Sequence, residues 1–420
     1  MKAKYSILYY LMCAYIVIMP LIQEGTNIKG IPVSDILLGI IIIWYFINLF
    51  FKKATRERFI YGIKDIFSNV LSIYIMILLG IMLLSTFYAL EKGLALSESA
   101  RFLTYVFIFF IIKYEFNTKK LVKNLLGCYI FTAGVLSIFG IIQYFTKIGL
   151  DKKFVEKYSS GYSVVKIATT MFNPNAYSAF LILIIFPVVM LTIYEKNKKI
   201  KSIYGIISIL LFVNIIMTYS RSAQLGVCLG AMILCVIYSY KLIIAFGGIG
   251  ILTLFMPSVF DRVRDLTNAS QNASRFKLWK TAIMMIKEHP ILGVGNGNYI
   301  SRYDEYVNKY KGLSYNAYTR YPAHNSYLKV ESELGVIGIV SFLAILLTSL
   351  FRVKKLFTTT EDKFIKAFYM GAFASMIAFY FMNIFDNLFF VPMATTYFWF
   401  LVATAESLLN SSLRDSNIKE

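Results

Sequence analysis

Residues 33–51 read VSDILLGIIIIWYFINLFF, a long apolar run in which Asp35 is the one charged side chain. About 20 consecutive apolar residues cross the hydrocarbon core of a bilayer as a helix, whereas helices of soluble proteins keep one polar face. Similar runs occur at 69–88, 203–219 and 388–405. The sequence therefore predicts an all-α integral membrane protein.

The overall composition agrees with this class. Of the 420 residues, 58% are hydrophobic and 16% are charged, which leaves too little polar surface for a soluble protein of this length. The four cysteines lie inside apolar runs, so we expect small buried side chains and neither a disulfide framework nor a metal site. Lys2 and Lys4 precede an apolar stretch without a small-residue cleavage site, which predicts an uncleaved first span.

Apolar segments of sufficient length predict about twelve membrane spans. Their approximate cores are 5–22, 33–51, 69–88, 99–113, 122–145, 176–194, 203–219, 223–239, 241–257, 335–351, 366–384 and 388–406.

Short connections between these spans alternate in charge, and every second one is basic. Cytoplasmic connections are enriched in Lys and Arg, so we expect both termini in the cytoplasm. The net charge of +20 then reflects membrane topology and not a nucleic-acid partner. The basic residues are Lys52, Lys53, Arg56, Arg58, Lys64, Lys113, Lys119, Lys120, Lys123, Lys196, Lys198, Lys199, Lys201, Lys241, Arg352, Lys354, Lys355, Lys363 and Lys366.

Two long connections, about 146–175 and 258–334, are expected on the outer face. The second holds eleven Lys and Arg residues, at 262, 264, 275, 277, 280, 287, 302, 309, 311, 320 and 329. A solvated loop needs only mixed charge, whereas a phosphate-bearing substrate favours an excess of cations. We therefore expect a phosphate-bearing substrate on this face.

The larger outer connection contains two predicted helices. Ser274 is the expected N-cap of an amphipathic helix that ends at Pro290 and lies along the membrane surface. The segment Gly293–Gly297 is a turn and no nucleotide loop, because no strand precedes it. A second helix over about 298–311 carries tyrosines on one side, which we expect to anchor in the headgroup region. They are Tyr299, Tyr303, Tyr306 and Tyr310.

Two residues are candidates for chemistry. Pro322 suits a first helical turn, which puts His324 near a helix N-terminus, where the helix dipole favours the neutral imidazole that can accept a proton. His289, in a polar turn, is expected at the surface. Arg221 stands between two apolar runs, and an ionisable residue at that depth is a functional candidate.

A polar outer cavity should collect further side chains. Asn173 and Asn175 open the sixth predicted span, and Asp386 lies in the turn between the last two spans. The outer segments show no close carboxylate pair and no histidine cluster, so we expect no metal and no cofactor. Arginines would then stabilise a leaving pyrophosphate through bidentate hydrogen bonds.

Four motifs in this order resemble the O-antigen ligase/polymerase superfamily over roughly residues 165–340. They are Thr169–Asn175, Ser220–Gly226, Arg275-Phe-x-x-Trp279 running to His289–Gly295, and His324–Leu328 followed by Glu333–Gly338. The resemblance implies a GT-C-like helical fold and a metal-independent, inverting glycosyltransferase that uses an undecaprenyl-pyrophosphate-linked glycan. It also implies the inner membrane of a bacterium, with the active site on the extracytoplasmic side.

Residue roles follow from the resemblance by position. His324 is similar to the loop histidine that activates the acceptor hydroxyl, and Arg221 and Arg275 to the arginines that hold the donor pyrophosphate. Arg320 is a further pyrophosphate candidate, Asn325 is a supporting residue, and Arg262 and Arg264 are weaker candidates. The expected domains are an N-terminal membrane region at 1–175, a catalytic region at 176–406 that includes the outer loop at 258–334, and a cytoplasmic tail at 407–420.

The acceptor stays open at this stage. Members of the superfamily transfer finished glycan to a lipid, polymerise repeat units or glycosylate proteins. The abundance of Lys, Ile, Tyr and Asn suits an AT-rich genome and slightly favours the polymerase branch. A lipid-linked glycan flippase is the alternative from another class, although the large loop occurs once and no motif is repeated.

Overall fold

The computed structural model describes residues 6–23, 25–28, 31–157, 163–241, 269–314 and 319–417, and within them the fold is almost entirely helical. Two short antiparallel hairpins interrupt it: β1 (Asn27–Ile28) with β2 (Ile31–Pro32), and β3 (Val155–Lys157) with β4 (Ser163–Val165). The helices are α1 (Ile7–Ile18), α2 (Val33–Phe51), α3 (Lys53–Ser68), α4 (Val70–Ser85), α5 (Lys92–Glu115), α6 (Lys119–Thr146), α7 (Pro174–Tyr194), α8 (Lys198–Met217), α9 (Arg221–Ile237), α12 (Ala269–Glu288), α13 (Tyr299–Lys309), α14 (Ser326–Thr359), α15 (Lys363–Met382) and α16 (Pro392–Asn417), with the short 3-10 turns η1 (Lys152–Phe154) and η2 (Leu388–Phe390).

The helices confirm an integral membrane protein but not the exact span count. In the described ranges, seven helices are long and apolar enough to cross a membrane, or eight if α3 and α4, bent by 87°, form one span. The shorter apolar helices α1 and α9 match two further predicted spans, and α16 matches the last and continues to Asn417. The predicted span at 241–257 lies outside the described residues.

Helix α7 forms the centre of the bundle. It is apolar on all sides and is buried along most of its length, as expected for a helix that meets other helices all round. Small residues let its neighbours approach closely, because a Cβ on Gly371 of α15 would lie 2.2 Å from the carbonyl oxygen of Phe186. A Cβ on Gly230 of α9 would likewise meet the Phe186 ring at 2.1 Å.

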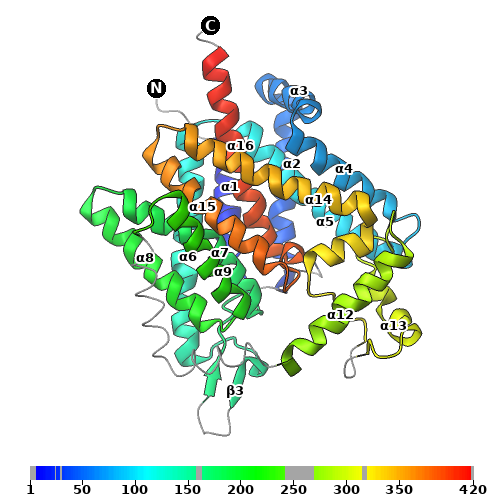
Figure 1. Ribbon diagram of the computed structural model, residues 1–420. Helices are drawn as coiled ribbons and strands as arrows, with labels where there is room; N and C mark the ends of the chain where they lie inside the picture. Colours follow the sequence, from blue (N-terminus) through cyan, green and yellow to red (C-terminus); the bar gives the residue numbers. More distant parts are fainter. Residues whose placement is uncertain are drawn as a thin grey trace.

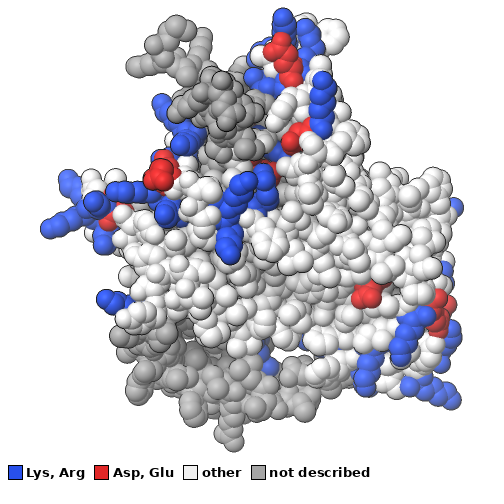
Figure 2. Space-filling model, turned by 45° about the horizontal axis from the view of Figure 1, so that its top comes forward, with Lys and Arg blue, Asp and Glu red and all other residues white. Residues whose placement is uncertain are grey.

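The bundle has two distinct ends (Figure 1). The chain termini and α3 lie at one end, which we call the basic end because the short Lys- and Arg-rich connections lie there, and α12, α13 and β3 lie at the other. Figure 2 shows charged side chains at both ends and a broad uncharged band between them. Such a band is what the hydrocarbon core of a bilayer requires.

A buried ionic network, which we call the Lys113 cluster, joins four helices at the basic end. Lys113 Nζ of α5 lies 2.7 Å from Asp65 Oδ2 of α3 and 3.3 Å from Glu406 Oε2 of α16. Arg352 of α14 forms a bidentate pair with the same Glu406 carboxylate, and Asn69 Nδ2 donates to it at 3.1 Å. The two cations and two carboxylates balance, as buried charges must.

Helices α12 and α13 form a small unit with its own core, and two predictions for this unit are wrong. Helix α12 begins no later than Ala269, so Ser274 lies inside the helix and is not its N-cap, although the helix does end just before Pro290. Tyr299, Tyr303 and Tyr306 do not anchor in headgroups, because α12 covers them, while the anchoring of the partly buried Tyr310 stays a prediction. The contacting residues are Leu278, Ala282 and Met285 of α12 and Tyr299, Tyr303 and Tyr306 of α13.

Candidate functional site

His324 lies in the loop before α14 and not inside the helix. Asn325 is the N-cap and accepts hydrogen bonds from the N–H groups of Tyr327 and Leu328, both at 3.0 Å. Pro322 therefore precedes the helix, and its predicted place in the first turn is wrong, while the expectation that His324 lies near a helix N-terminus is confirmed. Its φ of 49° is a left-handed conformation that a histidine rarely adopts, and this turns the side chain toward the loop after α15.

That loop holds the opposite side of the site. Ser326 donates its N–H to the Asn383 carbonyl at 2.9 Å and its hydroxyl to Asn383 Oδ1 at 2.7 Å. Asn383 Oδ1 also accepts the N–H of Phe389 at 2.8 Å. The start of α14 and the α15–η2 loop are therefore fixed to each other beside the imidazole.

His324, Asp386 and Asn175 form a hydrogen-bonded chain. His324 Nδ1 lies 3.1 Å from Asp386 Oδ1, and Asn175 Nδ2 donates to Asp386 Oδ2 at 2.8 Å. Asn173 caps α7 by accepting the backbone N–H of Asn175. This contact fixes the position from which the Asn175 side-chain amide reaches Asp386. With a carboxylate at Nδ1, the proton of the neutral ring is held there, and Nε2 is the nitrogen that can accept a proton.

The surroundings of Asp386 favour its charged form. Burial raises the pKa of this carboxyl, but the hydrogen bond and charge of His324, the Asn387 N–H at 2.8 Å and the positive charge of Arg275 together lower the pKa below its ordinary value. Asp386 is thus an anion at neutral pH that can stabilise an imidazolium on His324.

Helix α12 passes beside the hydrogen-bonded residues His324 and Asp386. Trp279 Nε1 donates to the His324 carbonyl at 3.3 Å, and the Trp279 ring lies 6.3 Å from that of Phe385. Arg275, one turn earlier, is half-buried, and its charge acts on Asp386. The predicted cation and the predicted histidine are therefore neighbours in space although they are far apart in the sequence.

Arg221 begins α9 at the same end of the bundle. A Cβ on Gly226 would lie 3.4 Å from Met382 near the end of α15. Five helical residues span about 7.5 Å, so Arg221 lies beyond Met382 at the level of the loop that contains Asp386. The side chain is half-buried, as expected for a cation at the border of the apolar band.

Arg320 takes a different direction from the other candidate cations. Its guanidinium pairs with Glu91 of the α4–α5 connection at 2.7 Å, and its N–H donates to Asp304 Oδ1 at 3.1 Å. The hydrogen bond and the positive charge of the Arg320 guanidinium lower the pKa of Glu91. The predicted pyrophosphate role of Arg320 stays a prediction, as does the supporting role of Asn325. Arg262 and Arg264 lie outside the described residues.

A polar contact that the sequence did not predict supports α14, the helix that follows His324. Helix α14 is kinked at Gly335, whose φ of 65° breaks the helical hydrogen bonds. The loop before α13 replaces them: Val294 N–H donates to the Ser332 carbonyl, Gly295 N–H to the Glu333 carbonyl, and Val336 N–H to the Pro290 carbonyl, each at 2.9 Å. The predicted turn at 293–297 is confirmed. It packs against the kink in α14, where its N–H groups donate to the carbonyls of α14.

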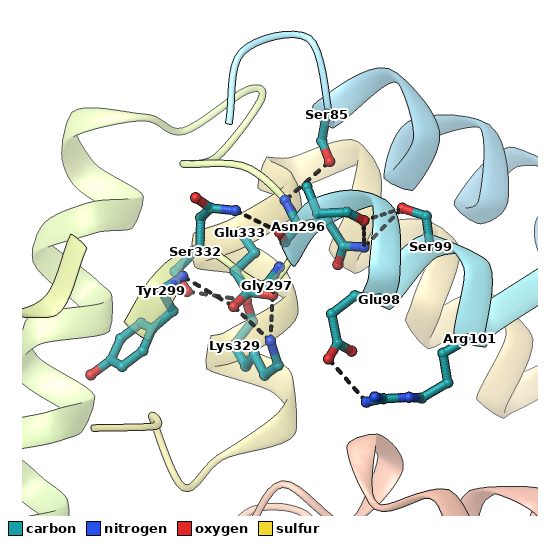
Figure 3. Close-up of polar contacts among 12 residues, drawn as sticks. Ser85, Glu98, Ser99, Arg101, Asn296, Gly297, Tyr299, Lys329, Ser332 and Glu333 are labelled. Atoms are coloured by element: carbon teal, nitrogen blue, oxygen red, sulfur yellow. Dashed lines mark hydrogen bonds and ion pairs between the residues drawn. The ribbon is translucent and has the colours of Figure 1, made fainter. Parts of the chain in front are cut away.

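Glu333 fixes this loop (Figure 3). Its buried carboxylate accepts the N–H groups of Gly297 at 2.9 Å and Tyr299 at 3.1 Å, and pairs with Lys329. On the other side of the loop, Asn296 bonds to Ser85 and Ser99 of the neighbouring helices. The one sequence signal for this contact was a carboxylate two residues before the predicted span at 335–351.

Metal ligands do not assemble in the described ranges. There, no group of three His, Cys, Asp or Glu side chains is placed to hold a metal ion.

The fold and the site define a multi-span helical membrane protein with a histidine–carboxylate pair and arginines at one end. Residues 206–343 match the family model described as O-Antigen ligase, which confirms the resemblance to the O-antigen ligase/polymerase superfamily. The matched segment contains Arg221, Arg275 and His324 and ends before Asp386.

A curated relative extends the comparison without adding a function. A Haemophilus influenzae protein, described as an uncharacterized protein, is 27% identical over 192 residues, which cover 39% of this chain and 46% of that protein. The chain therefore spans about half the length of this relative.

Proposed function

We propose that the protein transfers glycan from an undecaprenyl-pyrophosphate-linked donor to an acceptor hydroxyl, as a surface polysaccharide polymerase or O-antigen ligase. The observation that carries the proposal is the His324–Asp386 pair beside Arg275. A proton acceptor and fixed cations in one place suit a reaction in which a hydroxyl is activated and a pyrophosphate leaves.

The proposed step is one displacement. His324 Nε2 takes the proton of the acceptor hydroxyl while its oxygen bonds to the anomeric carbon of the donor sugar. The bond from that carbon to the pyrophosphate oxygen breaks on the opposite face, so the configuration inverts. Arg221 and Arg275 stabilise the charge on the departing polyprenyl pyrophosphate, and Asp386 stabilises the imidazolium.

The proposed location is the bacterial inner membrane, with α12 and α13 on the extracytoplasmic side. The support is the positive-inside rule: the short basic connections and both chain termini lie at the basic end, opposite α12 and α13. Basic residues in the long segment that contains α12 and α13 do not oppose this orientation, because the rule counts mainly short loops.

His324→Ala tests the proposal, with His289→Ala as a matched control because His289 is exposed and outside the chain of hydrogen bonds. We expect glycan transfer by His324→Ala to fall below detection in membranes of a deletion strain, with normal protein level and normal lipid-linked donor. The control should transfer at the parental rate. Full transfer by His324→Ala would refute the assignment of the base.

Two readouts separate the alternatives. Accumulation of donor on the cytoplasmic leaflet in His324→Ala would instead identify a flippase. Among transferases, loss of a polymerase leaves single repeats attached to the acceptor, whereas loss of a ligase leaves polymer on the carrier lipid. Glycan missing from a protein acceptor would identify protein O-glycosylation.

A further inference from the structure

Helix α3 connects the apolar helices α2 and α4 at the basic end and is itself rich in charged residues. It follows α2 directly and meets α4 at an angle of 87°, with Asn69 at the bend. If α4 crosses the bilayer, α3 lies close to the membrane plane, at the level of the headgroups. Figure 1 shows α3 at the outer edge of the basic end.

The inward face of α3 is fixed to the bundle. A Cβ on Gly62 would lie 2.5 Å from the Phe110 ring of α5, so the two helices touch. Arg58 pairs with Glu115 at 2.7 Å, and Asp65 pairs with Lys113 at 2.7 Å. These contacts fix the rotation of α3 about its axis and therefore which side chains point away.

The outward face carries apolar and basic side chains together, because Arg56, Ile60 and Lys64 follow one another at four-residue spacing. Ile60, Ile63 and Phe67 are exposed, and at three- and four-residue spacing they share one face. Phe67 is 79% exposed, and together with Ile60 and Ile63 it forms a contiguous apolar group, which marks an interaction surface. Such an apolar face beside cations is the arrangement of an interfacial helix.

Four cations accompany this apolar face. Lys52, Lys53, Arg56 and Lys64 are exposed, against the single outward carboxylate of Glu57, whose contact with Lys53 is long at 3.9 Å. Figure 2 shows Lys and Arg side chains gathered at the top of the molecule, with a smaller number of Asp and Glu side chains among them. The contrast with Arg58 and Asp65, which are satisfied inside the protein, leaves the outward charge unbalanced.

We propose that α3 is an interfacial helix that binds the phosphate headgroups of anionic phospholipids at the basic end. Ile60, Ile63 and Phe67 enter the upper acyl region, while the four cations contact the headgroups. This surface is separate from the His324 site and does not depend on the proposed transfer reaction. A negatively charged leaflet attracts basic segments by about 1 kcal/mol per Lys or Arg near the surface.

The test uses the full-length protein in nanodiscs of phosphatidylcholine with or without one third phosphatidylglycerol. Native mass spectrometry counts the phosphatidylglycerol molecules that remain bound after release. The variant carries Lys53→Gln, Arg56→Gln and Lys64→Gln. The matched control carries Lys198→Gln, Lys199→Gln and Lys201→Gln, which remove three exposed cations from another basic connection at the same end.

We expect the α3 variant to lose phosphatidylglycerol affinity about tenfold or more, and the control to lose less than threefold. Phe67→Ser should weaken retention of both lipids, because it removes apolar insertion and leaves the charge. Equal losses in the α3 variant and the control would overturn the proposal, since the effect would then be general attraction. Dimerisation that the α3 variant abolishes, with unchanged lipid retention, would show that a second copy covers this face.

Discussion

The two ends of α14 reach two polar clusters that differ in how their charges are satisfied. Near the basic end, Arg352 belongs to the Lys113 cluster, in which the side chains of Lys113 and Glu406 are fully buried. At the other end, the His324 cluster comprises His324, Asp386 and Asn175, and the His324 side chain remains 28% exposed. We call the first cluster closed because its central pair, Lys113 and Glu406, is fully buried and its charges balance, and the second open because its imidazole reaches solvent.

The difference indicates what each cluster contributes. Removing one partner of a buried ion pair leaves an uncompensated charge, so the Lys113 cluster constrains how the helices pack. In the His324 cluster, the described contacts of the imidazole are Asp386 at Nδ1 and the Tyr321 ring at 5.4 Å. A proton acceptor with an accessible side can serve a ligand, so we assign stability to the closed cluster and chemistry to the open one.

Asp386→Asn should have the largest effect, and it should fall on transfer. The amide can present its NH₂ group to Nδ1, which moves the ring proton to Nε2 and removes the proton acceptor. We expect the initial rate of transfer in reconstituted vesicles to fall roughly 10²- to 10⁴-fold, the range in which loss of an orienting carboxylate acts.

Thermal unfolding is the control for this variant, because the amide oxygen still accepts from Asn175 Nδ2, and the hydrogen bond from the Asn387 N–H is the one contact that is lost. A shift of less than about 1 kcal/mol in the free energy of unfolding is expected, as for an ordinary hydrogen bond. Transfer within tenfold of the parent would show that the carboxylate does not set the tautomer. Large destabilisation would mean that the open cluster is structural as well.

Lys113→Met should have the next largest effect, and it should fall on stability. The substitution leaves Asp65 and Glu406 with one buried cation fewer, which costs about 3–5 kcal/mol when a buried pair is broken. Denaturant unfolding in mild detergent measures the loss. Transfer per folded molecule should stay unchanged, because the Lys113 cluster lies at the opposite end from His324.

A double-mutant cycle sharpens this prediction. Asp65→Asn together with Lys113→Met removes the unpaired carboxylate, so the double variant should be more stable than the sum of the single losses predicts. Additive losses would indicate that Lys113 and Asp65 do not interact in the membrane. Reduced transfer per folded molecule would show that the two ends of α14 are coupled.

Much of the fold could be predicted from the sequence because the length of an apolar run is a local property. The span predicted at 33–51 is helix α2 with the same bounds, and Pro290 does end α12. Packing partners are not local. The spacing of Tyr299, Tyr303 and Tyr306 shows one face of a helix but not that α12 covers it.

In the candidate site, too, residue identities could be predicted from the sequence but contacts between distant residues could not. Residue types identified His324 and Asp386, but the hydrogen bond between them joins positions 62 residues apart, which no spacing rule gives. Arg320 was grouped with the other arginines by charge, whereas its partner Glu91 is 229 residues away. The kink at Gly335 depends on the Ile291 carbonyl, which would lie 2.0 Å from a Cβ at this position.

Glu288→Gln should have the smallest effect, and it calibrates the comparison with a third cluster that lies in solvent. Glu288 joins α12 to α13 by accepting from Lys309 Nζ at 2.6 Å, Tyr310 and Tyr306. The hydrogen bonds of Lys309 and Tyr310 lower the pKa of Glu288 to about 2. A carboxyl group whose pKa is lower in the folded than in the unfolded protein stabilises the fold at pH values above its unfolded pKa of about 4.3. This contribution disappears as the pH falls toward 2.

Solvent screening should keep this contribution small despite the low pKa. We expect Glu288→Gln to weaken α12–α13 contacts by less than about 1 kcal/mol at pH 7, as for exposed ion pairs. Hydrogen exchange of the α13 amides, corrected for intrinsic rates, should lose protection between pH 4.3 and pH 2 in the parent and change less in the variant. A loss above about 2 kcal/mol at pH 7 would contradict the view that burial, and not the number of hydrogen bonds, separates structural clusters from accessible ones.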